Sequence, residues 1–301
     1  MTEYTPYSGE LGSDFVGAVL DMPNKEYHAM RSHYSSTNLK YMNSSSPLHF
    51  KEKFLSGAPL EELTSDAVVL GSASHSLVLT PDLFAHEFLP MPLCDGRTKE
   101  GKKIKSDTLS LAEGRKVISD SIYSKACHIS ESVLSDAASR KLFDGDFIPE
   151  AAFFWKCPFS GLMMRSKLDG IAGNGEYIIE LKTTRSAEPS KFERDAYNMG
   201  YDLSAFHYLE GVRQSGFENC KDVYIIAVET EAPYAVQCYK ASERFLASGN
   251  EKWLDAVNKL EQGLNQSIWP GYVNSEIEEY PELNPPRWAK LSEDNSVEDG
   301  E

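Results

Sequence analysis

Residues 173–184, GNGEYIIELKTT, place a glutamate and a lysine two positions apart in an otherwise apolar run. The Tyr, Ile and Thr residues of this run are typical of a β-strand, and the Asn-Gly pair before it is the strongest short signal for a hairpin turn. Because side chains alternate across a strand, Glu180 and Lys182 share one face, while Leu181 lies on the other. Two charged side chains on one face of such a strand need a partner, and a metal ion with oxygen ligands is one candidate.

A two-residue turn at positions 174–175 determines the pairing of the two strands by counting. The resulting opposite pairs are Gly173–Glu176, Ile171–Ile178, Asp169–Glu180 and Lys167–Lys182. The carboxylates of Asp169 and Glu180 then face each other with Cβ atoms about 5 Å apart, and like charges so placed destabilise a hairpin. Mg²⁺ bound through these carboxylate oxygens would neutralise them, so the sequence predicts a magnesium site on this face.

Two further cations lie on the carboxylate face by the same two-residue period. Arg165 and Lys167 precede Asp169 by four and two positions. They either balance the charge of the carboxylates or contact the phosphate groups of a ligand, and the sequence leaves both interpretations open.

The elements around this hairpin predict an α/β fold, with a sheet flanked by helices. Hydrophobic periodicity predicts helices over residues 35–55, 65–80, 108–143, 190–214 and 242–266. The first of these reads as two short helices, the second with Ser46 as N-cap and Pro47 at its first position. Strands are expected over residues 150–157, 162–172, 176–184, 222–230 and 235–241. Residues 94–107 are expected to form a Gly- and Lys-rich loop, and residues 1–20 a flexible lead-in.

Length and composition predict a soluble, cytoplasmic protein. The 301 residues, 41% of them apolar, can form one large domain or two small ones. No apolar run is long enough for a membrane span, and the first residues lack the pattern of a signal peptide. The five cysteines are odd in number and include no CxxC pair, which favours reduced thiols over a zinc or iron-sulfur site.

The net charge of −16 argues against binding nucleic acid over the whole surface. Residues 275–301 carry nine acidic and two basic residues, which is −7 of the total and leaves −9 for the rest. Any contact with phosphates must therefore be local.

Together, KLDGI and GNGEYIIELKTT resemble the core of the PD-(D/E)xK nucleases, and in detail the exonuclease VIII (RecE-type) family of phage and prophage exodeoxyribonucleases. The resemblance covers most of the chain and extends to the segments DMPNKEYHAM, SSSPLHF, LGSASHSLVLTPDLF, GRTKEGK and WPGY. It implies a restriction-endonuclease-like core with a mixed central β-sheet. This core would form a single nuclease domain over residues 21–274, followed by an acidic tail over residues 275–301.

The resemblance also assigns site residues. It implies that the metal is held by His75, Asp169, Glu180 and the carbonyl of Leu181, and that the catalytic group is Lys182. Glu150 lies where many relatives keep an acidic residue, and Tyr201 and Tyr208 match two tyrosines of a following helix. Relatives commonly have a glutamine between those tyrosines, where this chain has Ser204. The basic segment that would contact DNA contains Arg97, Lys99, Lys102, Lys103 and Lys105, although a merely solvated segment would look the same.

The function that the resemblance implies is a metal-dependent exodeoxyribonuclease. It would degrade linear double-stranded DNA, 5′ to 3′, to expose single strands for recombination, with Mg²⁺ or with Mn²⁺ as a substitute. A ring-like homo-oligomer and a single-strand annealing partner protein are further implications. Two alternatives stay open: a catalytically weak module that binds DNA ends, and a sequence-specific endonuclease.

Overall fold

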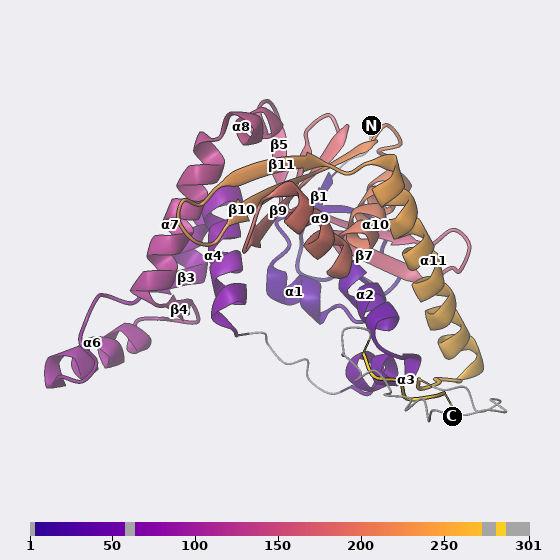
Figure 1. Cartoon of the computed structure of the whole chain (residues 1–301), viewed down its shortest axis with the longest axis horizontal. Coiled ribbons are helices and arrows are strands. Elements are labelled where there is room, and N and C mark those ends of the chain that lie inside the picture. The colour runs from indigo at the N-terminus through magenta and orange to yellow at the C-terminus, as the bar shows by residue number, and fades with distance from the viewer. Residues whose placement is uncertain (1–3, 58–63, 273–280, 287–301) are drawn as a thin grey trace, which may run out of the picture.

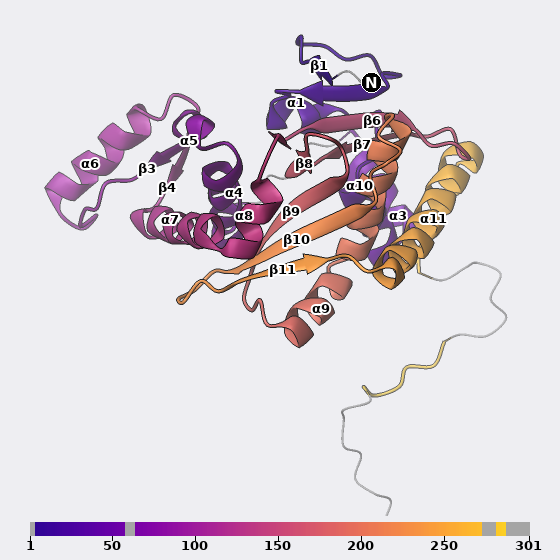
Figure 2. The same cartoon turned by 90° about the horizontal axis from the view of Figure 1, so that it is seen from above.

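The computed structural model describes residues 4–57, 64–272 and 281–286. Its centre is a sheet with the strand order β11–β10–β9–β8–β5 (Figures 1 and 2). These strands are β5 (Phe147–Pro149), β8 (Gly170–Ala172), β9 (Tyr177–Thr184), β10 (Asp222–Glu229) and β11 (Val236–Lys240). β9 and β10 are parallel and the other neighbours antiparallel, which confirms the predicted mixed central sheet.

A second sheet has the order β1–β2–β6–β7. It consists of β1 (Tyr4–Pro6), β2 (Gly17–Leu20), β6 (Ala152–Lys156) and β7 (Met163–Lys167). Residues 4–20 therefore contain regular structure that the sequence pattern did not predict. The physical reason is that β2 pairs with β6, more than 130 positions later, and no local pattern can reveal such a partner.

The predicted strand over residues 162–172 is in fact two strands that lie in different sheets. β7 pairs with β6 in the second sheet, and β8 pairs with β9 in the central sheet. The pairing of Ile171 with Ile178 confirms the predicted register of the hairpin. The pairing of Lys167 with Lys182 is wrong, because Lys167 lies opposite Ala152 of β6.

The chain passes between the central sheet and the second sheet at two places, which lie next to each other. The change occurs between β5 and β6 at Glu150, and between β7 and β8 at Asp169, and the Glu150 N–H donates to the Asp169 carbonyl at 3.3 Å. Glu150 has a φ of 54°, the left-handed region that non-glycine residues seldom adopt. The two sheets therefore diverge at this point, and β9 has no partner in β8 beyond Ile179. This unpaired edge of β9 is called the opening below.

Helices cover both faces of the central sheet (Figure 2). On one face, α4 (Asp66–Leu79) and α7 (Asp120–Ser135) bury Ile179 and Leu181 of β9. On the other face, α10 (Tyr201–Gln214) packs against Ile178 of β9. Successive side chains of β9 therefore alternate between the two faces, as predicted, and Glu180 and Lys182 lie on the same face as Ile178.

Several predicted helices are shorter than expected. The first region contains α2 (Ser36–Ser44), α3 (Pro47–Phe50) and a π-helical turn, η1 (Lys51–Leu55). Ser46 caps α3 as predicted, because its hydroxyl accepts from the His49 N–H. The region over 190–214 is divided by Gly200, whose φ is 67°, into α9 (Pro189–Asn198) and α10. The last helix, α11 (Glu243–Gln266), agrees with its prediction.

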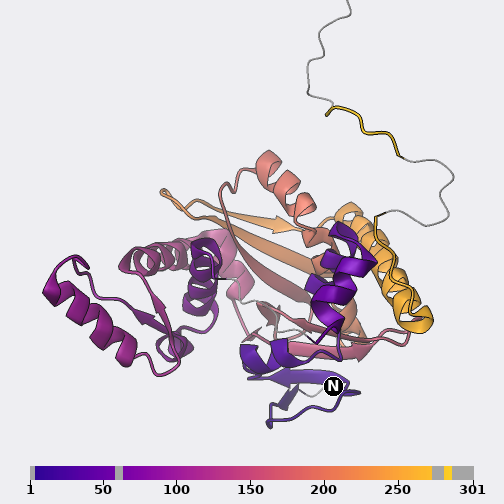
Figure 3. The same ribbon diagram turned by 90° about the horizontal axis from the view of Figure 1, so that it is seen from below.

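The basic segment is not a loop over its whole length. It contains α6 (Lys99–Ser110), which begins after Thr98 because that hydroxyl accepts from the Gly101 N–H at 2.9 Å. Figures 1 and 3 show α6 standing away from the central sheet.

The predicted helix over residues 108–143 is interrupted as well. It contains the end of α6, β4 (Lys116–Ile118), α7 and α8 (Ala137–Phe143), and β4 pairs with β3 (Phe88–Pro90). Two short helices, α1 (Asn24–Ala29) and α5 (Pro81–Glu87), were not predicted.

The WPGY segment packs on α3. The Trp269 ring stacks on Phe50 with an interplanar angle of 9°, and the Pro270 carbonyl accepts from the Leu48 N–H at 3.0 Å. The predicted acidic tail lies outside the described residues except for 281–286, which have no regular structure. The five cysteines are free, and no helix of the described part has the length and apolar character needed to cross a membrane.

Candidate active site

The site lies at the edge of β9 that β8 leaves uncovered. The ladder between these strands stops at Gly170, so the backbone groups of Leu181 have no strand partner on that side. Instead, the Leu181 N–H donates to Asp169 Oδ2 at 2.7 Å, and the Leu181 carbonyl accepts from two side chains, His75 and Lys182. The change of sheet at Asp169 therefore creates a polar opening beside an otherwise apolar strand.

The opposed carboxylates predicted from the register are both present in this opening. Asp169 is next to the last paired residue of β8, and its N–H lies 3.4 Å from Glu180 Oε1. Burial disfavours the charge of Asp169, but the cations of Lys182 and His75 outweigh it and hold the pKa of Asp169 well below its ordinary value. Burial and the Asp169 charge raise the pKa of Glu180 to about 7, although Lys182 opposes this. Of the two carboxyl groups, Glu180 is thus the one that holds a proton near neutral pH.

Lys182 lies between these acids. Its Nζ is 2.7 Å from Glu180 Oε2, 3.4 Å from Asp169 Oδ2 and 3.1 Å from the Leu181 carbonyl. Burial disfavours the ammonium, but the two carboxylates raise the pKa of Lys182 well above its ordinary value. A lysine held in this way stays charged at any working pH.

His75 reaches the same point from α4. Its Nε2 is 2.8 Å from the Leu181 carbonyl and 3.2 Å from Asp169 Oδ2, and its Nδ1 is 2.8 Å from the Gly71 carbonyl one turn earlier. Burial opposes protonation, but the Asp169 carboxylate raises the pKa of His75 to about 9. The helix that was predicted from sequence therefore delivers its histidine to the acids.

Glu150 and Lys167 form a separate pair beside the opening. Lys167 Nζ is 2.8 Å from Glu150 Oε2, and it also donates to the Met22 carbonyl at 3.0 Å and to Asn24 Oδ1 at 2.7 Å. Burial raises the pKa of Glu150, and the charge of Asp169 adds to this effect. Lys167 thus ties Glu150 and the start of α1 together, and it does not contact Glu180 or Asp169 directly.

The α10 residues predicted for the site do face it. The Tyr201 ring centroid is 5.8 Å from Lys182 Nζ, and Tyr208 accepts a hydrogen bond from Ser36 of α2 at 3.4 Å. Between them, Ser204 is buried, and its hydroxyl has no hydrogen-bond partner. The two tyrosines occupy one helix face, as their spacing predicted.

Lys40 is a residue that the sequence analysis missed. It lies on α2, one turn after Ser36, and its Nζ is 5.7 Å from the centroid of the Tyr201 ring that Lys182 also approaches. Burial and the nearby Lys182 charge lower the pKa of Lys40 to about 8. Within the described residues its ammonium makes no ion pair. No motif distinguishes this lysine from other helix lysines, because its position depends on the packing of α2 against α10.

The structure does not bring every predicted residue to the opening. Arg165 is buried under α1, where its Nη1 donates to the Tyr27 carbonyl. Arg97 and the four lysines of the basic segment are exposed on and before α6, and Arg97 pairs with Asp95 at 3.1 Å. Their role as DNA contacts stays a prediction.

The donor set fits a hard divalent cation. Asp169 Oδ2, Glu180 Oε2 and the Leu181 carbonyl converge on the point where Lys182 Nζ lies, and His75 Nε2 is beside two of them. Carboxylate and carbonyl oxygens are the ligands that Mg²⁺ prefers, and an added imidazole suits Mn²⁺ as well. Within the described part of the chain, no three His, Cys, Asp or Glu side chains are arranged to enclose an ion, and the Lys182 ammonium lies among the oxygens.

The comparison with protein families assigns the chain to one of them. A family model, the PDDEXK-like domain of unknown function (DUF3799), matches residues 35–282. The chain belongs to this family, which confirms its resemblance to the PD-(D/E)xK nucleases and the restriction-endonuclease-like core.

Comparison with solved structures supports the same fold. A protein from Eubacterium rectale named as a candidate exonuclease is 14% identical, with a TM-score of 0.58, over 88% of this chain and 97% of its own. A phage-related exonuclease from Haemophilus somnus 129PT is 11% identical over 78% of this chain and 96% of its own, and its TM-score of 0.34 is too low to support an argument. No curated protein matches the chain.

Proposed function

We propose that the protein is a metal-dependent exodeoxyribonuclease that degrades linear double-stranded DNA, 5′ to 3′, and exposes single strands for recombination. The observation that supports this most is the convergence of Asp169, Glu180, the Leu181 carbonyl and His75 on one point at the open edge of β9. The family to which the chain belongs and the name of the Eubacterium rectale protein agree with a nuclease.

In this proposal Asp169, Glu180, His75 and the Leu181 carbonyl hold Mg²⁺, with Mn²⁺ as a substitute. A divalent cation there supplies charge neutralisation at the scissile phosphate and activation of the attacking water. Lys182 lies beside the ligands without being one, because an ammonium has no lone pair. Its part is to orient the water or to offset the negative charge that develops on the phosphate.

The tyrosines and Lys40 form the other wall of the site. Both the Lys40 and the Lys182 ammonium lie within 6 Å of the Tyr201 ring centroid, at 5.7 and 5.8 Å. We assign Lys40 to a phosphate contact, since an ammonium without an ion pair beside the reacting centre is available to an anion.

The experiment compares two DNA forms. End-labelled linear duplex and closed circular duplex are incubated with the protein and Mg²⁺, and the products are resolved by size. Loss of the 5′ label as mononucleotides from linear DNA alone supports the proposal. Cutting of the closed circle would identify an endonuclease, and binding of ends without any cutting would identify an end-binding module.

Two further parts of the proposal concern assembly. In a homo-oligomer that surrounds the duplex, the local basic α6 segments of several copies would face one DNA molecule, although each copy has a net charge of −16. An annealing protein that binds the exposed single strand would be the partner. Sedimentation with and without duplex ends tests the first, and copurification with a single-strand annealing protein tests the second.

A further inference from the structure

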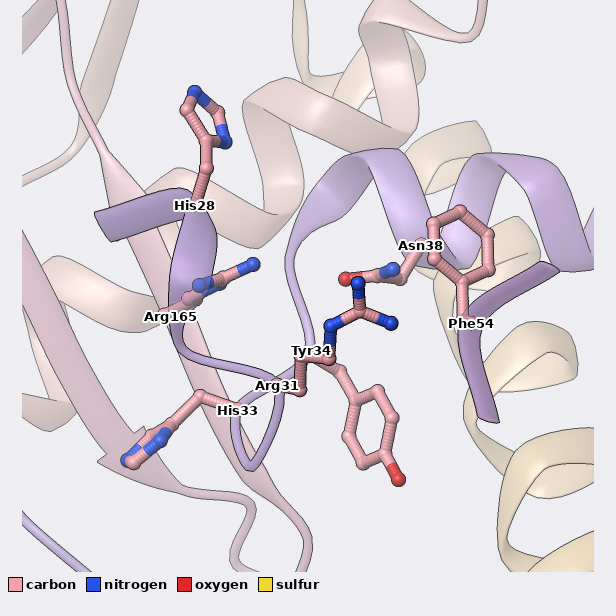
Figure 4. Close-up of a pocket in the computed structure, with 7 residues that line it drawn as sticks. All are labelled: His28, Arg31, His33, Tyr34, Asn38, Phe54 and Arg165. Carbon is pink, nitrogen blue, oxygen red and sulfur yellow. The ribbon is translucent and has the colours of Figure 1, made fainter. Parts of the chain in front are cut away.

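A small hollow lies between α1, α2 and β7, beside the opening that contains Asp169. Its walls are formed by His28, Arg31, His33, Tyr34, Asn38, Phe54 and Arg165 (Figure 4). Its volume is about 20 Å³, which is room for one group of the size of water. The hollow can therefore take the oxygen end of a small anion, but not a base or a sugar.

Arg165 is the residue that makes this hollow unusual. It is 6% exposed, and no carboxylate of the described residues pairs with it. Its guanidinium carbon lies 4.7 Å from the Tyr27 ring centroid, and Nη1 donates to the Tyr27 carbonyl. Its Nε is buried without a hydrogen-bond partner. A buried charge without a counterion is costly, so the fold retains here a cation that an anion would stabilise.

Arg31 adds a second guanidinium to the residues that line the hollow. Figure 4 shows the side chains of Arg31 and Arg165 extending toward the middle of the hollow from different sides. Burial lowers the pKa of both His28 and His33, so the histidines add no charge near neutral pH. His33 is in addition held by Ser32 and by the Phe15 carbonyl, at 3.0 and 3.1 Å, and acts as a wall.

The position of Arg165 relates the hollow to the candidate active site. Arg165 is four residues before Asp169, so at the rise of a strand it lies no more than about 13 Å away along the chain. α1 connects the two places, since its first residue, Asn24, contacts Lys167 and Tyr27 contacts Arg165. DNA phosphates are spaced a few ångströms apart along a strand, so an anion in the hollow would be within a few nucleotides of the scissile one.

We propose that Arg165, with Arg31 at the rim, forms a second phosphate site that holds one phosphate group of the DNA substrate. That the phosphate belongs to a DNA substrate rests on the proposed function. Binding of a phosphate anion in the hollow does not. The planar guanidinium fork matches a phosphate better than a lysine would. The phosphate is either the terminal one of a DNA end or an internal phosphodiester.

The first test uses inorganic phosphate and no DNA. Thermal melting is recorded in a chelator with and without phosphate for the wild type, Arg165→Gln and Asp169→Asn. Phosphate should raise the melting temperature of the wild type and of Asp169→Asn, and should not raise that of Arg165→Gln. Arg213→Gln is the matched control, because Arg213 also donates to a backbone carbonyl, that of Cys220, but lies outside the hollow. An equal rise in Arg165→Gln and wild type overturns the proposal.

A second variant, Arg31→Glu, tests phosphate binding in the hollow if Arg165→Gln does not fold. Arg31 is exposed, so Arg31→Glu can reverse the charge at the rim without disturbing the core. It should remove the phosphate-dependent rise, and an unchanged rise overturns the proposal. Because these measurements need neither metal nor cleavage, they are independent of whether the protein is a nuclease.

The second test distinguishes the two phosphates. Equilibrium binding of 5′-phosphoryl and 5′-hydroxyl duplexes is measured in Ca²⁺ for the wild type and whichever variant folds. The variant should bind DNA about tenfold more weakly, which is the effect of losing one charged hydrogen bond. Weakening confined to the 5′-phosphoryl duplex identifies the terminal phosphate, and equal weakening of both identifies an internal one. Unchanged binding of both duplexes overturns the role in DNA binding.

Discussion

The Lys182 ammonium lies 2.7 Å from the Glu180 carboxylate two residues before it, because both side chains stand on the same face of β9. In this position the lysine does for the two carboxylates what a metal ion would do. A divalent cation that binds Asp169 and Glu180 must therefore displace the Lys182 ammonium from between them.

Lys182→Ala should separate metal binding from chemistry. Removing the competing ammonium should leave metal binding intact or tighter, and DNA binding nearly unchanged. Cleavage should fall by roughly two to four orders of magnitude, the range for loss of one electrostatic or proton-transfer group. Single-turnover degradation of a linear duplex, measured beside equilibrium binding in Ca²⁺, checks this. Lys221→Ala, at an exposed lysine, is the control, and a parallel loss of binding and cleavage would assign Lys182 to substrate recognition instead.

Asp169→Asn and Glu180→Gln should remove most of the stabilisation by metal. Mg²⁺ or Mn²⁺ that binds the native state alone raises stability by about 2.7 kcal/mol at one hundred times its dissociation constant. Melting with and without metal should show this rise in the wild type and in Asp255→Asn, an exposed carboxylate elsewhere. Equal shifts in the wild type and both site variants would place the metal at another position.

Glu180 should make the stability of the protein without metal depend on pH. Its pKa in the folded state is about 7, above the ordinary value of 4.5, because burial and Asp169 favour the protonated form. The folded state therefore binds the proton more tightly, and the free energy of unfolding falls as pH rises from about 4.5 to about 7. Relative to Glu180→Gln, the wild type should lose about 1–3 kcal/mol over this range. Urea unfolding of both proteins in a chelator measures it, and parallel pH profiles would contradict the assignment.

Lys40→Met should stabilise the protein and impair its function. The ammonium has no ion pair in the described structure, and burial lowers its pKa to about 8, so its charge is costly at neutral pH. An apolar side chain of similar length should raise the melting temperature by a few degrees, since the packing against Tyr201 is kept. DNA binding in Ca²⁺ should weaken at the same time. A variant that is less stable and binds DNA normally would show that Lys40 is only a packing residue.

Neutralising the α6 lysines should weaken DNA binding and reduce its dependence on salt. Replacing Lys102, Lys103 and Lys105 by Gln removes up to three phosphate contacts, so the slope of log affinity against log salt should fall by up to about 3. The same change at Lys156, Lys221 and Lys240, which are exposed elsewhere, has an equal effect on net charge and is the control. If the two triple variants have the same slope, α6 is only a solvated face.

The local features of the site could be predicted from the sequence, and the long-range ones could not. The Asn-Gly turn determined the pairing of Ile171 with Ile178 and hence placed Asp169 opposite Glu180. The helix that carries His75 followed from its apolar pattern. In contrast, the only residue that marks the change of sheet at Asp169 is Gly170, and a single glycine also occurs within strands, so the pattern of residues 162–172 looked like one strand.

The positions of Lys40 and Arg165 could not be predicted, because they depend on tertiary contacts. Lys40 is at the site because α2 packs on α10, and Arg165 is buried because α1 covers β7. The basic segment was expected to be a loop because it contains Gly96 and Gly101. The N-cap of Thr98 and the helix-forming lysines prevailed over those glycines.

The packing of residues 269–272 on α3 has a consequence for how the chain folds during synthesis. α3, which adjoins α2 and hence Lys40, packs against residues 269–270. β2 pairs with β6. Both N-terminal segments therefore reach their final packing only after residues much later in the chain have been made. Contacts of such large sequence separation form slowly and only after most of the chain has left the ribosome. A nascent chain that ends before Trp269 lacks the contact with α3, so α3 gains this packing partner only after α11 has been made.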